Sequence, residues 1–259
     1  MTPRRRWVAA AAGGALLLAA CGDDSPASRG DTTTTAAAAE PVIDPGDGGH
    51  YAPDLDPARF VDQVDNPYFP LVPGTRWVYE GQDDDETEHI EVEVLDETRA
   101  IEGITATVVR DTVSVDGEVT EDTYDWYAQD EDGNVWYLGE DTHEYEDGQP
   151  TDDSGSWEYG TDGALPGIVM LAHPKVGDAY RQEYDEGEAE DMGEVLEVGS
   201  TVDIGLGSYD DVVVTEDWNP LEADVIEQKS YAPDIGVIRE EKVAGGDGVI
   251  ELIAFTPAG

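Results

Sequence analysis

The chain has 259 residues, of which 61 are acidic and 13 basic, so its formal net charge is −48. A phosphate backbone is bound through basic patches, which excludes nucleic acid as a partner and argues against lying flat on anionic lipid. Cys21 is the single cysteine, so no disulfide can form within the chain and its core must stabilise the fold alone.

The first 20 residues have the pattern of an export signal. Arg4-Arg5-Arg6 precedes an apolar run of 14 residues, from Trp7 to Ala20, and Cys21 follows directly. A positive start, a short apolar run and small residues before a cut are typical of a signal peptide. The run is shorter than the roughly 20 residues that span a bilayer. We therefore predict cleavage between Ala20 and Cys21, with simple cleavage without lipidation, or an uncleaved anchor, as alternatives and the general or twin-arginine export route left open.

A cysteine at this position resembles the bacterial lipoprotein signal. The resemblance implies that the thiol of Cys21 receives a diacylglyceryl group and that fatty acyl chains such as palmitate anchor the mature protein. Two acyl chains hold a protein stably, whereas one does so only marginally. We therefore expect a lipid-anchored protein on the outer face of the cell membrane, in the cell envelope. Without the three signal arginines, 10 basic residues face 61 acidic ones, a formal charge of −51.

Residues 21–55 are predicted to form a disordered tether after the lipidated cysteine. This stretch holds a threonine run at 32–35, an alanine run at 36–39 and several prolines and glycines, with few large apolar residues. Such a composition cannot bury enough surface to offset the entropy of ordering. Residues 56–259 then form a single folded domain.

The folded part is predicted to begin with one short helix, over residues 56–64. Asp56 can cap it, Pro57 suits its first position, and Asn66-Pro67 ends it. Every later periodic segment has the pattern of a strand. The predicted strands cover residues 77–80, 88–95, 105–115, 118–128, 135–138, 180–184, 211–215, 225–231, 236–243 and 249–255.

Turn signals at Asp116-Gly117, Asp132-Gly133 and 245–248 join neighbouring strands into hairpins. Residues 188–198 fit both helical and two-residue spacing, and the surrounding strands favour a strand. Residues 140–163 are polar and turn-rich and are predicted to be a long, partly packed loop region. Strands do not alternate with long helices, which argues against a parallel α/β fold. The predicted class is mainly β: one antiparallel, strongly curved sheet, a sandwich or a half-barrel.

Three segments carry a family resemblance. The first, 66–80, contains Tyr-Phe-Pro-Leu, Pro-Gly-Thr and Trp-Val-Tyr; the second covers 122–137; the third, 231–238, contains Tyr-Ala-Pro and Gly-Val. They resemble a group of uncharacterised bacterial lipoproteins common in actinobacteria, over most of residues 62–255. The resemblance implies a curved antiparallel β fold like the half-barrels of lipoprotein carriers that hold acyl chains, and it implies no activity. Asp234 replaces the commoner glycine in the closing turn, and Asp tolerates left-handed backbone.

No metal site is predicted. Residues 130–134, Asp-Glu-Asp-Gly-Asn, offer oxygen ligands, but a calcium loop needs a longer spacing and a closing glutamate, and a hairpin turn explains each residue. The acidic runs at 83–86 and 152–153 are expected to be solvated loops. The four histidines do not have the spacing of a zinc site: His50, His89, His143 and His173.

No catalytic or cofactor-binding residue is predicted either. With 61 carboxylates, a pair at glycosidase distance occurs by chance. A Gly-x-Ser-x-Gly elbow is absent from the sequence. Residues 205–207 begin like a dinucleotide fingerprint, but Asp210 replaces its third glycine, so a turn between strands explains them better. Cys21 serves as the anchor and cannot be a nucleophile.

Aromatic residues are the remaining candidates for a site. They could line a groove for a glycan or an acyl chain, although core packing and cross-strand pairing explain them better: Trp126, Tyr127, Trp136, Tyr137 and Trp157. Trp126 and Tyr127 are neighbours on one strand and should point to opposite faces.

Three functions are therefore open. The first is a monomeric, non-catalytic module that binds an apolar or glycan ligand or an envelope component, and an apolar concave pocket would favour it. The second is a hydrolase of envelope glycans, which two converging carboxylates, one strongly desolvated, would favour. The third is a structural or shielding protein, which a filled core without a cleft would favour.

Overall fold

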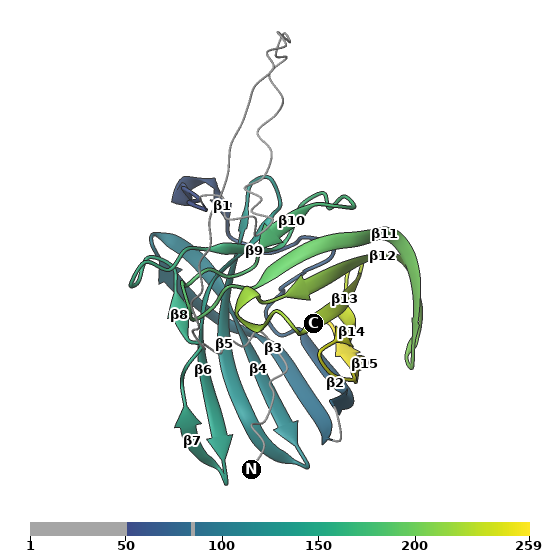
Figure 1. The fold of residues 1–259 in the computed structure, drawn as a ribbon. Coiled ribbons are helices and arrows are strands. Elements are labelled where there is room, and N and C mark those ends of the chain that lie inside the picture. The colour runs from purple at the N-terminus through teal and green to yellow at the C-terminus, as the bar shows by residue number, and fades with distance from the viewer. Residues whose placement is uncertain (1–50, 84–85) are drawn as a thin grey trace, which may run out of the picture.

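The computed structural model describes residues 51–83 and 86–259, and these form one 15-stranded antiparallel sheet (Figure 1). The predicted fold class is confirmed. The strands are β1 (Phe60–Val61), β2 (Arg76–Asp83), β3 (Glu86–Ile101), β4 (Ile104–Val115), β5 (Glu118–Asp130), β6 (Val135–Glu146), β7 (Gln149–Asp152), β8 (Trp157–Glu158), β9 (Gly167–Met170), β10 (Ala179–Arg181), β11 (Met192–Ile204), β12 (Gly207–Trp218), β13 (Ile226–Ala232), β14 (Gly236–Ala244) and β15 (Gly248–Thr256).

Neighbouring strands of the sheet follow the order β10-β11-β12-β13-β14-β15-β2-β3-β4-β5-β6-β7, while β1 pairs with β5, and β8 and β9 pair with β6. Most neighbours are also consecutive in sequence, because tight hairpins join them. Asp116 and Gly117, between β4 and β5, have φ of 54° and 82°. This left-handed pair matches the twist of antiparallel strands and suits Asp-Gly. Asp234 also lies in the left-handed region, with φ of 62°.

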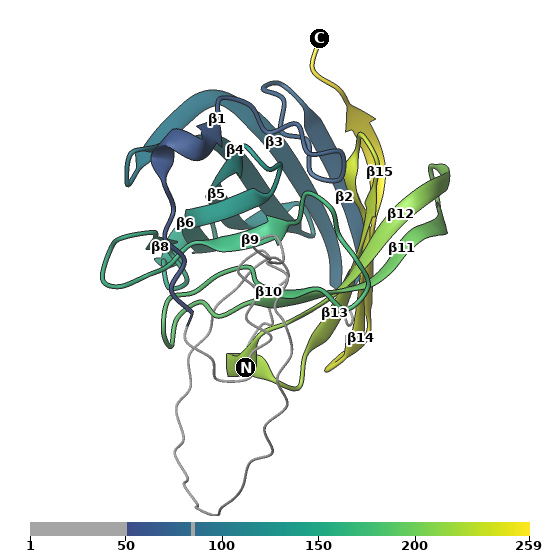
Figure 2. The ribbon, with the colours of Figure 1, turned by 90° about the horizontal axis from the view of Figure 1, so that it is seen from above.

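The sheet curls around an interior until β9 approaches β10 (Figure 2). A single bridge joins this region, in which the amide of Leu165 donates to the carbonyl oxygen of Tyr184 over 2.8 Å. Gly167 makes the approach possible, because a Cβ there would lie 2.0 Å from the carbonyl oxygen of Gln182. The two ends of the sheet therefore meet without a continuous ladder, which makes the fold a strongly curved half-barrel.

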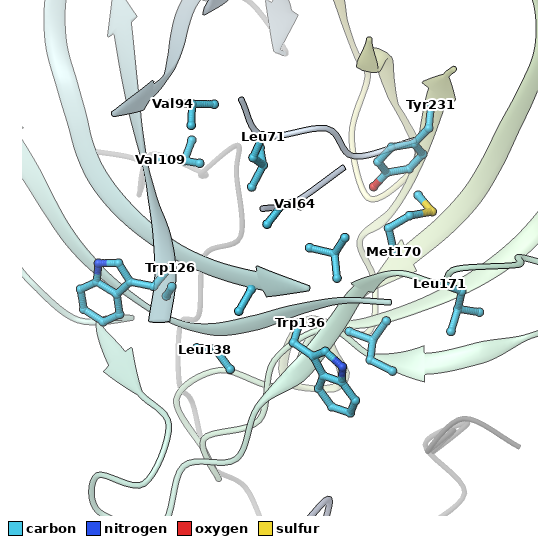
Figure 3. Close-up of a cluster of buried hydrophobic side chains, with 14 of the residues drawn as sticks. Val64, Leu71, Val94, Val109, Trp126, Trp136, Leu138, Met170, Leu171 and Tyr231 are labelled. Carbon is cyan, nitrogen blue, oxygen red and sulfur yellow. The ribbon is translucent and has the colours of Figure 1, made fainter. Parts of the chain in front are cut away.

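The main hydrophobic cluster draws buried residues from both faces of the curled sheet. Figure 3 labels ten of them: Val64, Leu71, Val94, Val109, Trp126, Trp136, Leu138, Met170, Leu171 and Tyr231. Val64 and Leu71 come from the segment before β2, which is held in place by an antiparallel bridge between them. Burial of such side chains stabilises a fold by about 1.5–3 kcal/mol each.

The predicted N-terminal helix is much shorter than expected. It is a 3-10 turn, Pro57–Arg59, whose first residue is Pro57 and whose cap is Asp56, as predicted. Phe60 and Val61 leave the turn and pair with Asp130 and Gln129 of β5. Sheet pairing therefore replaces the expected later turns of the helix, because it joins this segment to the edge of the domain.

The predicted loop at 140–163 was wrong in its first half. Strand β6 continues to Glu146, and β7 returns beside it before the chain reaches β8. Polar residues make up most of the paired ends of β6 and β7. The alternation of apolar and polar residues that predicts a strand is therefore missing there, although the two backbones pair. The ambiguous stretch at 188–198 contains the start of β11 and is a strand from Met192, as favoured.

The domain also begins earlier than residue 56. Tyr51 is buried, its hydroxyl donates to the carbonyl oxygen of Pro166, and its ring packs edge-on against Tyr184. The last residues of the expected tether are therefore part of the packed domain. The predicted turn at 205–207 is confirmed, because it joins β11 to β12 with Ile204 opposite Gly207.

Candidate binding cavity

A cavity of about 190 Å³ lies inside the half-barrel. Its wall comes from β2, β3, β4, β5, β6, β9, β13, β14 and β15, from the segment before β2 and from two short turns. The residues lining it are Phe69, Pro70, Leu71, Trp77, Tyr79, Ile90, Val92, Val109, Asp111, Asp125, Tyr127, Tyr137, Val169, Gln182, Glu183, Lys229, Tyr231, Ile235, Gly236, Val237, Glu240 and Ile250.

Aromatic rings form much of this wall. Tyr127 stacks on Tyr137 with their centroids 4.7 Å apart and their planes 18° apart, and Phe69 meets Tyr127 edge-on at 5.2 Å. Trp77 donates from Nε1 to the carbonyl oxygen of Ile235 over 2.7 Å. Because that polar atom has a backbone partner, its ring can serve as apolar lining.

Four carboxylates also line the cavity: Asp111, Asp125, Glu183 and Glu240. Of the four, Asp125 has the clearest hydrogen-bond partner, because the Tyr137 hydroxyl donates to its Oδ1 over 2.5 Å. Burial raises the pKa of Asp125 to about 6, and the hydroxyls of Tyr137 and Tyr127 partly offset this by stabilising the carboxylate. Asp125 therefore titrates near neutral pH.

Asp111 and Glu183 each have a buried carboxyl oxygen that accepts no hydrogen bond from the described residues. Burial raises the pKa of Asp111 well above its ordinary value, and nearby Asp125 and Glu121 raise it further. Burial also raises the pKa of Glu183, with Asp191 as the next cause, while Lys229 and the indole of Trp157 partly lower it. Among the described residues, Oδ1 of Asp111 and Oε2 of Glu183 have no hydrogen-bond partner. Leaving such buried acceptors unpaired is costly, so they are poised to accept from a guest.

Lys229 is the one cationic side chain in the cavity wall, within the part of the chain that the structure describes. Its Nζ lies 3.3 Å from Oδ2 of Asp217 and 3.9 Å from Oε2 of Glu240. Burial lowers the pKa of Lys229, but the carboxylates of Glu240 and Asp217 outweigh this and raise it overall. The lysine is therefore charged, and its charge is directed at one side of the cavity.

The predicted aromatic candidates divide between core and cavity. Trp126 and Tyr127 do point to opposite faces: Trp126 lies beneath the guanidinium of Arg99, 3.9 Å from its ring centroid, while Tyr127 lines the cavity. Tyr137 also lines the cavity. Trp126, Trp136 and Trp157 are buried in hydrophobic clusters, so the preferred core interpretation is confirmed for the tryptophans.

The acidic residues of the cavity were not predicted from the sequence, although their spacing along the strands indicates two of them. Asp111 lies between Val109 and Val113 at two-residue spacing, so it shares their inward face in β4. Asp125 has the same spacing to Tyr127 in β5. An acidic residue in register with a buried apolar face is the pattern that would have found them. Glu183 has no such signal in the structure, because the strand predicted over 180–184 ends at Arg181 and Glu183 follows it outside any strand.

The predicted turn at 130–134 is confirmed. Asp130 organises it, since Oδ1 accepts from the amides of Asp132 and Asn134 at 3.0 and 2.9 Å, and Oδ2 accepts from Nε1 of Trp136 at 2.9 Å. Within the described residues, no group of three or more His, Cys, Asp or Glu could hold a metal ion.

Searching residues 51–83 and 86–259 for a helix long and apolar enough to cross a membrane finds none. The predicted signal peptide, Cys21, most of the predicted tether, His50 and residues 84–85 of the acidic run at 83–86 lie outside the described residues. The predicted cleavage between Ala20 and Cys21 and the lipidation of Cys21 therefore stay predictions.

No family model matches the chain, and no curated protein matches it. Two crystal structures are similar. A candidate exported protein with a YmcC-like fold from Bacteroides fragilis NCTC 9343 has 17% identity and a TM-score of 0.44, covering 73% of this chain and 99% of its own. A candidate lipoprotein from Parabacteroides distasonis ATCC 8503 has 13% identity and a TM-score of 0.41, covering 75% of this chain and 100% of its own.

Proposed function

We propose that this chain is a lipid-anchored protein on the outer face of the cell membrane whose β domain binds a small ligand without catalysis. The observation that carries the proposal is the cavity of about 190 Å³, which combines aromatic and aliphatic walls with a few convergent polar groups. That combination is the general pattern of a small-molecule site. An apolar cavity of about 150 Å³ holds a benzene ring, so this one has room for a ring with a short side chain.

The location rests on the N-terminal sequence. The charged start, the short apolar run and Cys21 support export and acylation, and the resemblance to bacterial lipoproteins supports the same location. The expected tether would hold the domain away from the membrane. The strongly acidic chain supports a partner other than nucleic acid, and a monomer is the simplest state for a protein held by its own anchor.

Native mass spectrometry of the protein purified from its own host envelope tests the proposal. We expect the full chain to carry both an acyl modification and a co-purifying small molecule. Val169 lines the cavity, so Val169→Phe should fill the space and lose the small molecule. Val198→Phe is the matched control, because Val198 is 46% exposed on β11 and lies away from the cavity wall. An empty wild-type protein would contradict ligand binding.

A second candidate, hydrolysis of envelope glycan, is favoured by one observation. Asp111 and Asp125 line the same cavity, and burial raises the pKa of both. A glycosidase uses one acid and one ionised carboxylate on either side of the scissile bond. The test is release of new reducing ends from isolated cell-wall glycan by the wild type but not by Asp125→Asn. Room for about one ring is small for a site that must hold sugars on both sides of a bond, so binding remains the first proposal.

A further inference from the structure

We infer that the cavity selects a small organic cation, namely a protonated amine attached to an apolar or aromatic body. This inference rests on the proposed binding function and names its ligand class. It follows from three features of the wall: the balance of charge, the buried acceptor atoms without partners and the aromatic faces.

The wall can carry a negative net charge once its carboxyl groups ionise, although burial makes Asp111, Asp125 and Glu183 hold their protons more tightly than in water. Four carboxylates line the cavity and are opposed by Lys229 alone among the described residues. The lysine lies nearest Asp217 and Glu240, which already exceed its single charge. Asp111, Asp125 and Glu183 form no ion pair with any residue in the described part of the chain. An anionic guest would oppose ionisation of these carboxyl groups, whereas a cation would favour it and supply the missing counter-charge.

The buried carboxyl oxygens without partners also favour a guest that donates hydrogen bonds, whatever the net charge of the wall. Asp111 is 9% exposed and Glu183 is 1% exposed, and each has one carboxylate oxygen that is buried without a described partner. Both residues line the cavity, from strand β4 and from the segment after β10. A guest that donates hydrogen bonds satisfies these oxygens, whereas a hydrocarbon guest leaves them unpaired. A charged donor forms the stronger bond.

The aromatic faces favour a cation over a neutral donor. The stacked pair of Tyr127 and Tyr137 lies next to the carboxylate of Asp125, which Tyr137 contacts directly. Aromatic faces attract cations, and this attraction grows when water is excluded. Carboxylates beside ring faces therefore offer an ammonium group both of the interactions that it can make in a buried site.

Binding of a cation should also release protons. The groups facing Asp111 are Asp125, Glu121, Glu240 and Asp122, and all of them raise its pKa. A bound cation would favour the ionised carboxylates and lower their pKa values. The protein must then lose protons to solvent when the ligand binds, which a neutral ligand does not require.

The experiment compares benzylamine, benzyltrimethylammonium and benzyl alcohol by isothermal titration on the full chain in a nonionic detergent. Benzylamine and benzyl alcohol have nearly the same shape and differ in charge. We expect benzylamine to bind at least about tenfold tighter than the alcohol, because its ammonium donates charge-assisted hydrogen bonds, which are roughly twice as strong as neutral ones. Benzyltrimethylammonium has no N–H to donate, so its affinity should lie between the two and should come from charge and ring faces alone. Titration of benzyltrimethylammonium in buffers of different ionisation enthalpy should reveal the released protons.

Asp111→Asn and Glu183→Gln keep the shape of the wall and remove one charge each. Each should weaken binding of benzylamine by about tenfold, because one charge-assisted acceptor is lost. Glu186→Gln is the matched control, because Glu186 is exposed and close to Glu183 in sequence. Its substitution removes the same charge from the chain. Its affinity should equal that of the wild type. Circular dichroism of each variant shows that the fold is retained.

Two results would overturn the inference. If benzyl alcohol bound as tightly as the cations, the cavity would bind ligands without selecting charge, and the proposed binding function would stand. If cations bound equally to the wild type and to both cavity variants, binding would come from the general surface charge. Failure of all three probes, with an empty protein from the host envelope, would remove both the inference and the proposed function.

Discussion

The hydroxyl of Tyr137 on β6 donates a 2.5 Å hydrogen bond to Oδ1 of Asp125 on β5. The bond holds a buried carboxylate inside a predominantly apolar cavity and lies directly beside the stacked ring of Tyr127. It is the clearest example of how this fold accommodates the acidic residues of its interior, and it leads to the first prediction.

Tyr137→Phe should destabilise the protein by about 1–3 kcal/mol at pH 8, because a buried ionised acceptor loses its donor. The pKa of Asp125 should rise further, since the Tyr137 hydroxyl now lowers it. Denaturant unfolding measures the stability. Tyr124→Phe is the control. Tyr124 is half-buried on β5, the strand of Asp125, and its ring faces Arg110, an interaction that Phe retains. Equal loss in both variants would contradict the role of the hydrogen bond.

Stability should fall as the pH rises from about 4 to 8. Burial raises the pKa of Asp125 and of Asp191 to about 6, and that of Glu227 to about 9. A folded state with raised carboxyl pKa values holds protons more tightly than the unfolded chain, so it loses stability as the pH passes from the ordinary values through the raised ones.

Denaturant unfolding across this range, at constant ionic strength, measures the slope. Asp125→Asn should make the fall shallower. Asp96→Asn is the matched control, because Asp96 is exposed and its replacement changes the net charge equally. A stability that increased between pH 4 and 8 would sink this prediction.

Gly167→Ala should destabilise the protein by about 1–3 kcal/mol, the range for overpacking. A Cβ at this position would lie 2.0 Å from the backbone oxygen of Gln182, so β9 must move away from the opposite end of the sheet. Hydrogen exchange of the Leu165 amide, which donates to Tyr184, should accelerate. Gly205→Ala is the control, because the nearest atom to a Cβ there is 4.0 Å away. An unchanged exchange rate at Leu165 would show that the approach of the two ends is not tight.

Salt should raise the melting temperature. After the predicted cleavage the chain would carry a formal charge of −51, and self-repulsion of that size opposes the compact state. The screening length falls from about 8 Å at physiological salt to about 3 Å at 1 M. Calorimetry in dilute buffer and in molar sodium chloride measures the effect, and sucrose of equal osmolality controls for exclusion from the surface. A melting temperature that stayed level or dropped in salt would end the idea of a salt-adapted surface.

Cys21→Ser should release the protein from membranes, because serine offers no thiol for the diacylglyceryl group. Fractionation of host cells followed by immunoblotting measures the distribution. Replacement of Ser28 by Ala, seven residues further along, is the control and should leave the protein in the membrane fraction. Retention of the Cys21→Ser protein on membranes would refute lipid anchoring.

Strand patterns could be read from the sequence because one face of each inner strand is apolar. Val109 and Val113 alternate with polar residues, and Asp116-Gly117 marks the turn that follows. The same reasoning failed in two places for physical reasons. The outer ends of β6 and β7 pair without burying apolar side chains, and Phe60 and Val61 join β5 by a pairing to residues far along the chain.

The cavity depended on tertiary contacts. Asp111, Glu183 and Lys229 lie on separate segments, and only the curl of the sheet brings them to one wall. Their separation in the sequence carries no information about that wall, because 61 acidic residues offer many equivalent candidates.

By itself, the sequence determined that this is a strongly acidic chain built of antiparallel strands, since charge and alternation are local properties of the residues. It also predicted the export signal and the anchor. Which carboxylates are removed from water was decided by the tertiary structure alone, because burial depends on how far the sheet bends and on where its ends meet. The chemistry of the cavity follows from that bend.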